Sequence, residues 1–273
     1  MEKLVNMATS WFDRRVLVTG HTGFKGSWLC LMLHRLGAQV HGLALDPPPG
    51  SSLFAAAHVG ELLHQDHRCD IRNHVAICQA MQVMQPEIIF HLAAQSLVLP
   101  AYHDPLGTFS TNIMGTAHVL AAACEVPAVR AMVVVTTDKV YENKEDGHRF
   151  CESDSLGGND PYSASKAGAE LVVASWRRSF AAQRIPPLAI ATARSGNVIG
   201  GGDWAEDRLL PDCIRAFSAN HPVTLRHPEA VRPWQHVLDP LSGYLSLAAK
   251  LLSDDGADWA ESWNFGPENG ESL

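Results

Sequence analysis

Short apolar runs alternate with longer stretches of mixed polarity along the first two thirds of the chain. Runs such as 88–90 and 132–135 are apolar on both faces, which is typical of parallel strands covered by helices on each side. Strands are predicted at residues 15–19, 38–45, immediately before Asp70, 87–92, 131–136 and 188–193. Helices are predicted at residues 26–36, 72–84, 108–124 and 162–182. This alternation predicts an α/β fold built on a doubly wound parallel sheet.

After about residue 196 the pattern changes. Glycine-rich and aromatic segments at 200–204 and 232–234 break up the alternation, and this part is predicted to form loops and small elements over the strand ends. The predicted organisation is a sheet domain with a smaller lobe. The sheet domain comprises residues 1–195 with 232–266 returning to it, and the lobe comprises residues 196–231 and 267–273.

Composition narrows the class of protein. The 273 residues are 46% hydrophobic and 18% charged, which is ordinary for a soluble globular protein. A formal net charge of −8 disfavours non-specific binding to nucleic acid. No window approaches the ~18 apolar residues of a membrane span, and residues 1–15 hold no long apolar segment typical of a secretion signal. We therefore predict a cytoplasmic protein that binds neither nucleic acid nor membrane.

Cysteines and histidines show no motif of a metal site. The six cysteines lack CxxC spacing, and the 14 histidines form no HExxH motif. Isolated cysteines of this kind are usually small buried residues of proteins in a reducing compartment. No bound metal is predicted.

A glycine-rich segment follows the first predicted strand and opens the first predicted helix. Dinucleotide binding needs such a turn, because the backbone must approach a pyrophosphate closely and the N–H groups at a helix start must point at it. Strand, turn and helix are all present, so we predict a dinucleotide site. Its predicted contacts are Gly20, Thr22, Gly23, Phe24, Lys25 and Gly26.

Residues after the next strands suit the rest of such a cofactor. Asp46 ends the second predicted strand, 20 residues after Gly26, where a carboxylate can accept hydrogen bonds from the adenosine ribose. Its neighbours along the chain are prolines, and no Arg or Lys accompanies it. The 2′-phosphate of NADP would therefore meet a negative charge without a basic partner, which favours NAD over NADP. Alternatively, Asp46 only caps a loop. Small residues after the fourth strand suit either a cofactor or plain packing. The further predicted cofactor contacts are Asp70, Ile71, Ala93 and Ala94.

Tyr162 and Lys166 form a candidate catalytic pair after the fifth predicted strand. A spacing of four residues projects both side chains from one helix face. An ammonium beside a phenol stabilises the phenolate and lowers the tyrosine pKa from about 10. Tyr162 is then a candidate general base toward a hydroxyl whose hydride leaves for NAD. Both residues are also predicted cofactor contacts.

Thr137, Asp138 and Lys139 end the fifth predicted strand, at the edge where ligands bind in open α/β sheets. Thr137 can hydrogen-bond the reacting hydroxyl. Asp138 and Lys139 are a neighbouring acid and base, able to protonate a leaving group and to move a proton on carbon. The alternative is a solvated strand end, where Asp and Lys are common. The tyrosine motif beside them favours the catalytic interpretation.

Motifs spread over nearly the whole chain carry a family resemblance. They are residues 18–28, 91–95, 137–141, 160–166, 194–204, 208 and 232–237. On these motifs the chain resembles the extended short-chain dehydrogenase/reductase family of NAD-dependent epimerases and dehydratases, and within it the sugar-nucleotide 4,6-dehydratases. The stretches 194–204 and 232–237 are the more specific ones. Related dTDP-glucose dehydratases carry Glu where this chain has Lys139, and UDP-sugar epimerases usually lack the Asp-Lys pair.

The resemblance implies a Rossmann-like fold and a three-step reaction on CDP-glucose. Tyr162, supported by Lys166 and Thr137, takes the C4 hydroxyl proton while a hydride passes to bound NAD. Asp138 and Lys139 then promote loss of the C6 hydroxyl as water, Asp138 as the acid and Lys139 as the base at C5. Return of the hydride to C6 gives CDP-4-dehydro-6-deoxyglucose. Such a product belongs to deoxysugar biosynthesis, for example of lipopolysaccharide O-antigen.

The resemblance also implies substrate contacts, a homodimer and a longer chain. The dimer forms through the helices near 108–124 and 162–182. Chains of the family normally continue for several dozen residues beyond 263–267, so we expect an incomplete, truncated substrate lobe in a fragment or a natural short form. The alternatives are a sugar-nucleotide epimerase that does not use the Asp-Lys pair, and an NAD-binding protein without activity. The implied substrate-binding residues are Gln95, Asn197, Arg208, Arg232 and Gln235.

Overall fold

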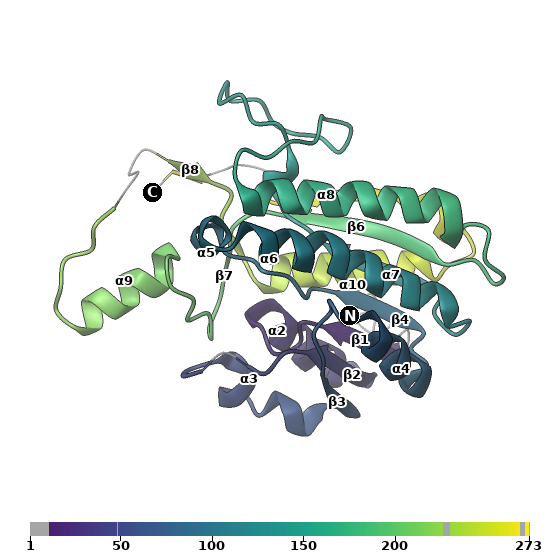
Figure 1. The fold of residues 1–273 in the computed structure, drawn as a ribbon. Helices are drawn as coiled ribbons and strands as arrows, with labels where there is room; N and C mark the ends of the chain where they lie inside the picture. The colour runs from purple at the N-terminus through teal and green to yellow at the C-terminus, as the bar shows by residue number, and fades with distance from the viewer. Residues whose placement is uncertain (1–10, 48, 226–229, 268–270, 273) are drawn as a thin grey trace, which may run out of the picture.

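A seven-stranded parallel sheet forms the centre of the computed structural model, which describes residues 11–47, 49–225, 230–267 and 271–272 (Figure 1). The strand order is β10-β6-β5-β4-β1-β2-β3, with every neighbouring pair parallel. Its strands are β1 (Arg15–Thr19), β2 (Gln39–Ala44), β3 (Gln65–Arg68), β4 (Ile88–His91), β5 (Ala131–Val135), β6 (Ala189–Ser195) and β10 (Ser262–Phe265). The chain winds outward in both directions from β1, which confirms the predicted doubly wound α/β class.

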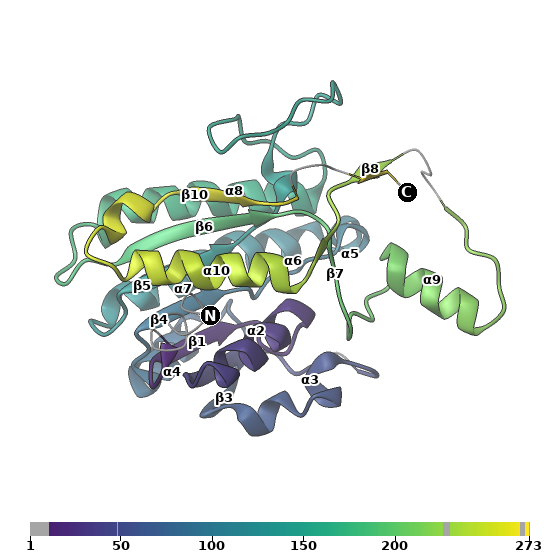
Figure 2. The ribbon, with the colours of Figure 1, turned by 180° about the vertical axis from the view of Figure 1, so that it is seen from behind.

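Helices cover both faces of the sheet (Figures 1 and 2). Those on one face are α4 (His74–Met84), α7 (Thr116–Glu125) and α8 (Pro161–Trp176). Those on the other face are α2 (Phe24–Arg35) and α10 (Leu238–Leu251). Successive strand residues enter opposite cores, as the pleat requires: Val16 and Val18 pack with α2 and α10, whereas Leu17 packs with α4 and α7. This two-sided burial explains why the strands are apolar on both faces.

The predicted helix at 108–124 is slightly longer in the structure. It begins with α6 (Pro105–Phe109), continues through the π-helical segment η2 (Ser110–Gly115) and ends with α7 at Glu125. Asp104 caps the start of α6, where its carboxylate accepts a hydrogen bond from the Gly107 N–H. Pro105 stands in the first turn, where its missing N–H costs no helical hydrogen bond. In the same way α8 continues into η4 (Arg177–Ala181).

The prediction of only loops and small elements after residue 196 is wrong in two places. The helices α9 (Leu209–Ser218) and α10 lie in this part of the chain. The sequence does not predict α10 because it contains Pro240 and Gly243, and both residue types usually interrupt helices. Pro240 lies in the first turn, where no N–H is needed. A side chain at Gly243 would have its Cβ 2.3 Å from the Phe265 ring, so this glycine lets α10 approach β10 closely.

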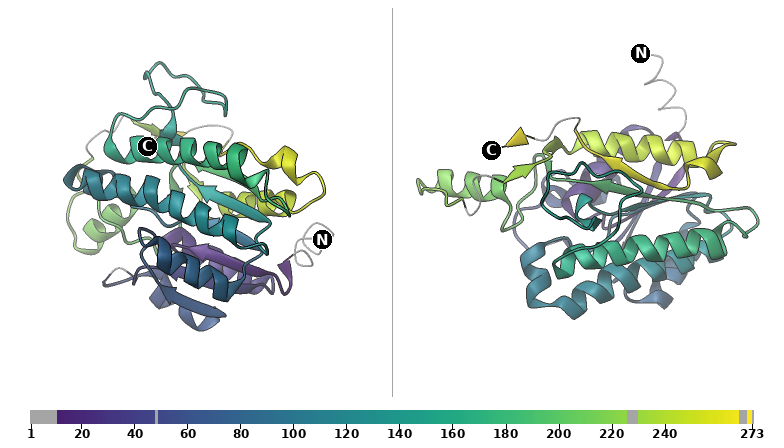
Figure 3. Two further views of the ribbon diagram at one scale, coloured as in Figure 1. Left: turned by 45° about the vertical axis from the view of Figure 1, so that its right-hand side comes forward. Right: turned by 90° about the horizontal axis from the view of Figure 1, so that it is seen from above.

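The remaining elements are short and gather mainly around the carboxyl ends of the strands. They are α3 (Leu53–Ala56), η1 (Val59–Leu62), α5 (Val98–His103), η3 (Asp138–Val140), β7 (Val198–Ile199), β8 (Val231–Arg232), β9 (Gln235–His236), η5 (Gly256–Trp259) and β11 (Glu271–Ser272). Figure 3 shows α9 and β8 extending beyond that end of the sheet. The division into a sheet domain and a lobe stays a prediction, and parts of it (1–10, 226–229, 268–270, 273) lie outside the described residues.

None of the helices in the described ranges is both long and apolar enough to cross a membrane. The cytoplasmic location stays a prediction, and the prediction that no secretion signal opens the chain falls on residues 1–10, outside the described part.

Candidate functional site

A cavity of about 1040 Å³ opens at the carboxyl ends of β1, β4, β5 and β6. Loops that follow these four strands form its floor, and α9 with the segments around β7, β8 and β9 forms its far wall. This position is the one at which doubly wound sheets bind ligands. The volume lies at the upper end of the range typical of small-molecule sites.

The glycine-rich loop between β1 and α2 has the shape that the sequence predicts. Gly20 has φ +74°, and a Cβ there would lie 2.7 Å from the backbone nitrogen of Ala93. A Cβ on Gly26 would lie 2.1 Å from the Gly20 carbonyl oxygen. The loop therefore tolerates no side chain at either position. Gly23 begins α2 without a side-chain cap, so the N–H groups of the first turn stay available at the cavity wall. This cradle fits a dinucleotide pyrophosphate.

The predicted contacts with adenine and ribose divide into two groups. Asp70, Ile71, Ala93 and Ala94 all line the cavity. Asp70 accepts hydrogen bonds from Arg72, which hold its pKa below the usual range. Asp46 is not among the described residues that line the cavity, and its side chain is 86% exposed at the rim.

The expectation that no basic residue accompanies Asp46 is wrong. Arg68 on β3 places its Nε 3.5 Å from the Asp46 carboxylate. Parallel pairing of β2 with β3 brings the two together, although the sequence separates them by 22 positions (68 minus 46). Arg68 also binds Asp66 at 2.7 Å, so a second carboxylate already offsets its charge.

The start of α8 places Tyr162 and Lys166 against the cavity. Asp160 caps this helix by accepting a hydrogen bond from the Ser163 N–H, and Pro161 occupies the first turn. Tyr162 and Lys166 are both buried, and both line the cavity. The Lys166 ammonium donates to the Val135 carbonyl oxygen at 3.1 Å, which ties α8 to the end of β5.

The expectation that Lys166 lowers the pKa of Tyr162 is wrong, because the pKa is raised in this structure. Burial raises the pKa of Tyr162 to about 12, although a hydrogen bond with Thr137 opposes the shift. Burial also lowers the pKa of Lys166 to about 8. The expectation failed because the sequence shows which charges lie nearby but not how deeply the phenol is buried.

Thr137, Asp138 and Lys139 stand beside the tyrosine, as the sequence predicts. Thr137 donates to the Asp138 carboxylate at 3.1 Å, and the Lys139 ammonium lies 3.3 Å from the same oxygen. The Asp138 and Lys139 side chains are 34% and 39% exposed; Lys139 lines the cavity, whereas Asp138 is not among the described residues that line it. The structure therefore brings a phenol and two ammonium groups to one wall, with the Asp138 carboxylate in contact with one of the ammonium groups.

Lys25 is a second buried ammonium at this wall. It donates to the Ser195 hydroxyl at 2.7 Å, and Tyr244 from α10 donates to the same oxygen at 2.8 Å. Burial lowers the pKa of Lys25 to about 7, with smaller contributions from Arg208 and Lys166. The sequence gives no signal for the roles of Ser195 and Tyr244, because α10 was not predicted.

Three of the five expected substrate contacts line the cavity: Asn197, Arg208 and Arg232. Arg208 is positioned by an ion pair with Asp203 at 3.0 Å. Asn197 Oδ1 and Trp234 Nε1 are buried at the cavity wall without a partner among the described residues. A buried polar atom without a partner is costly, so these two atoms are suited to bind a polar ligand.

The other two expected substrate contacts, Gln95 and Gln235, are absent from the described cavity lining. The amide of Gln95 bonds to the Leu97 backbone and the Thr108 hydroxyl, and that of Gln235 donates to the Phe265 carbonyl oxygen. Both side chains therefore stabilise loops in this structure.

A buried ion pair lies beneath α8. Glu170, one turn after Lys166, binds Arg194 on β6 at 2.8 Å, and the two side chains are 2% and 4% exposed. Threonines from β6 and the end of β5 donate to the same carboxylate, and Arg194 donates to the Tyr141 hydroxyl. This network fixes α8, and with it Tyr162, relative to the sheet.

Comparisons with known proteins agree with this geometry. The model of the NAD dependent epimerase/dehydratase family matches residues 16–260. A CDP-glucose 4,6-dehydratase from Salmonella typhimurium is 48% identical over 262 residues, which cover 95% of this chain and 72% of that protein. DesIV, a dTDP-glucose 4,6-dehydratase from Streptomyces venezuelae solved with NAD, has a TM-score of 0.78 at 26% identity over 94% of this chain and 77% of that chain.

The fold alone does not separate dehydratases from epimerases. UDP-glucuronic acid 4-epimerase from Bacillus cereus has a TM-score of 0.78 at 22% identity, over 94% of this chain and 79% of that chain. The distinction must come from the side chains at the cavity wall.

Proposed function

Because this chain belongs to the NAD-dependent epimerase/dehydratase family, we propose that it converts CDP-glucose to CDP-4-dehydro-6-deoxyglucose with loss of water. The observation that carries the proposal is the position of Tyr162 and Lys139 at one cavity wall, with Asp138 paired to Lys139. An oxidation at C4 needs only the tyrosine. The carboxylate and ammonium beside it supply the acid and base that elimination of water requires.

Tyr162 takes the proton of the C4 hydroxyl in the first step. The glycine-rich loop around Gly20 and Gly26 would hold NAD, which would supply the acceptor for the C4 hydride and its donor to C6. Burial raises the pKa of Tyr162 to about 12, and the Arg208 guanidinium opposes that rise. Before Tyr162 can act as a base, its own proton passes through the Thr137 hydroxyl to the Asp138 carboxylate, along the hydrogen bonds that join these side chains.

Asp138 and Lys139 act in the second step. The ketone at C4 makes the C5 hydrogen acidic, and Lys139 in its neutral form removes that proton. Asp138 in its protonated form donates to the C6 hydroxyl, which leaves as water. As the hydride arrives at C6, Lys139 gives a proton back to C5. Tyr162 is then protonated and Asp138 ionised, as they were at the start, and the 3.3 Å contact holds Lys139 beside Asp138 throughout.

Lys139→Met is expected to slow dehydration by about 10²–10³-fold, because the base at C5 is lost while the tyrosine stays. Oxidation at C4 should persist, visible as the absorbance of reduced nicotinamide that accumulates on adding substrate. Lys144→Met is the matched control, since Lys144 is an exposed lysine of the following loop. Dehydration at the wild-type rate in Lys139→Met would overturn the role of the pair.

The proposal also specifies the base of the nucleotide, which is cytosine. The relative from Salmonella typhimurium supports cytosine, and Arg208 with Arg232 at the cavity wall supports a diphosphate. The test is the initial rate of 4-keto product with CDP-glucose, UDP-glucose and dTDP-glucose, followed by the product's absorbance in alkali. CDP-glucose should be turned over fastest. Faster turnover of another nucleotide would contradict the assignment of cytosine.

Cofactor affinity should weaken as pH rises above about 7, because Lys25 loses its proton there. A bound anion raises the pKa of Lys25, so only the protonated protein binds tightly. The dissociation constant of NAD should be flat below pH 7 and rise by up to about tenfold per pH unit above it, until the pKa of the complex is reached. Fluorescence titration measures this profile. In Lys25→Met the rise should disappear; a rise that persists unchanged would contradict the role of Lys25.

A homodimer through the long helices is a further proposal. Leu106 on α6 and Leu171 on α8 are 80% and 63% exposed, and these two helices lie side by side (Figure 1). Large exposed apolar side chains on neighbouring helices are typical of a surface that another protein covers. Light scattering that gives the mass of a single chain would contradict the proposal.

A further inference from the structure

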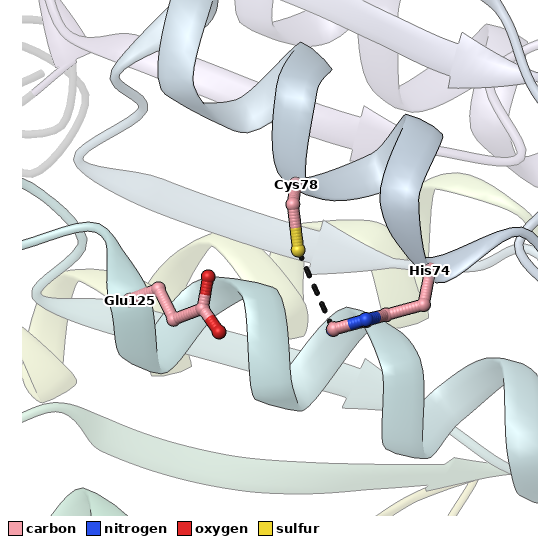
Figure 4. Close-up of side chains that lie close together, drawn as sticks. All are labelled: His74, Cys78 and Glu125. Atoms are coloured by element: carbon pink, nitrogen blue, oxygen red, sulfur yellow. Dashed lines mark hydrogen bonds between the residues drawn. The ribbon is translucent and has the colours of Figure 1, made fainter.

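Three side chains that can bind a metal meet between α4 and α7, away from the cavity. His74 and Cys78 are four residues apart on α4, and the Cys78 Sγ lies 3.4 Å from the His74 Nε2. Glu125, the last residue of α7, points at the same space from the neighbouring helix (Figure 4). One donor atom from each of the three lies within 4.8 Å of the other two.

The donor types and spacing suit a zinc ion. Zinc in proteins binds cysteine sulfur at about 2.3 Å, histidine nitrogen at about 2.0–2.1 Å and carboxylate oxygen at about 2.0–2.2 Å. Ligand atoms of a tetrahedral site are then about 3.3–3.6 Å apart. The sulfur–nitrogen pair already has this separation. The three donor atoms now lie within 4.8 Å of one another. Because Glu125 is exposed, rotation of its side chain can bring the carboxylate closer to the other two donors, into the range of a tetrahedral site.

The charges at this cluster also favour a cation. In the described part of the chain no lysine or arginine forms an ion pair with Glu125. A divalent cation between the thiol and the carboxylate would therefore meet no competing cation at this carboxylate.

We propose that His74, Cys78 and Glu125 bind one zinc ion, which links α4 to α7, with water at the fourth position. The ring of His118, also on α7, lies 5.5 Å from the ring of His74 and supports it. None of the three ligands belongs to the described lining of the catalytic cavity, so the ion stabilises the helical layer rather than the reaction. The chain shows no CxxC or HExxH motif here, because the ligands are a His–Cys pair four residues apart on α4 and a glutamate on a different helix.

Cobalt and zinc titrations of the full chain, first stripped with a chelator, test the proposal. One equivalent of Co²⁺ should bind with the absorption band of a cobalt–thiolate bond, and Zn²⁺ should displace it. Cys78→Ser should abolish that band and weaken zinc binding by at least about tenfold. Glu125→Gln should also weaken zinc binding. Cys124→Ser is the matched control, because Cys124 is a half-buried cysteine of α7 outside the cluster.

Melting temperatures of the metal-free variants show that each is folded, and zinc should raise the melting temperature of wild type but not of Cys78→Ser. Because Glu125 is exposed, Glu125→Gln keeps the test valid if Cys78→Ser fails to fold. The proposal is overturned if wild type takes up no zinc, or if Cys78→Ser and Glu125→Gln bind zinc as tightly as Cys124→Ser. Either outcome is independent of the dehydratase activity, which these titrations do not measure.

Discussion

Tyr162→Phe is expected to lower turnover of CDP-glucose by at least about 10³-fold, with NAD still bound. The substitution removes one oxygen from a buried side chain and keeps the ring that packs at the cavity wall. General bases contribute about 10²–10⁴-fold to rates, and no later step can proceed before the C4 hydroxyl is oxidised. Neither reduced nicotinamide nor 4-keto product should therefore form.

Two measurements make this result specific. Dialysis and fluorescence should show that Tyr162→Phe retains NAD as well as wild type does. Tyr102→Phe is the matched control, because Tyr102 lies on α5 with 58% of its surface exposed and should leave the rate unchanged. Turnover in Tyr162→Phe within tenfold of wild type would remove the tyrosine from the proposed mechanism.

Glu170→Ala is expected to destabilise the protein by about 3–5 kcal/mol. The substitution leaves Arg194 buried without its carboxylate, and it also removes the acceptor of two threonine hydroxyls. Breaking a buried ion pair from one side costs this much because an uncompensated charge stays behind. Urea denaturation should show the loss. Glu261→Ala is the matched control, because Glu261 pairs with Arg177 at the surface with 70% of its side chain exposed. That variant should lose about 0–1 kcal/mol.

The pH dependence of the same variant gives a second check. Burial opposes ionisation of Glu170, but hydrogen bonds from Arg194 outweigh it and hold the pKa below the usual value. A carboxyl group whose pKa is lowered by folding stabilises the folded state at pH values above its pKa in the unfolded chain, about 4.3. That stabilisation is lost as the pH falls below this value. The difference in stability between wild type and Glu170→Ala should therefore shrink on acidification. A constant difference would contradict the ion pair as its cause.

The sheet and the position of the cavity at its edge could be predicted because they depend on local signals. Runs such as 132–135 predict a buried parallel strand. Glycine is required at 20 and 26 because a Cβ added at either position would lie 2.1–2.9 Å from neighbouring backbone atoms. The spacing of four residues places Tyr162 and Lys166 on one face of any helix, so their proximity could be predicted without knowing the rest of the fold. Since parallel strands end at one edge of the sheet, motifs after β1, β5 and β6 had to meet.

The features that were missed depend on contacts between distant segments. Arg68 accompanies Asp46 only because β2 pairs with β3. Gly243 suggests an interrupted helix from the sequence alone. In the structure it leaves room for the ring of Phe265 to pack against α10. The amide of Gln95 is occupied by its own loop and by the hydroxyl of Thr108 on α6, which no motif reveals. Each case involves a partner in another element, so a pattern along the chain could not supply it.

The fate of a deuterium atom at C4 of CDP-glucose tests most directly whether this family member is a dehydratase. In a single turnover, the enzyme should release one water and deliver the deuterium to C6 of the product, with one solvent hydrogen entering at C5. Mass spectrometry and NMR of the product measure both positions. Recovery of the deuterium at C4, with the C6 hydroxyl retained, is the behaviour of an epimerase and would contradict the role assigned to Asp138 and Lys139.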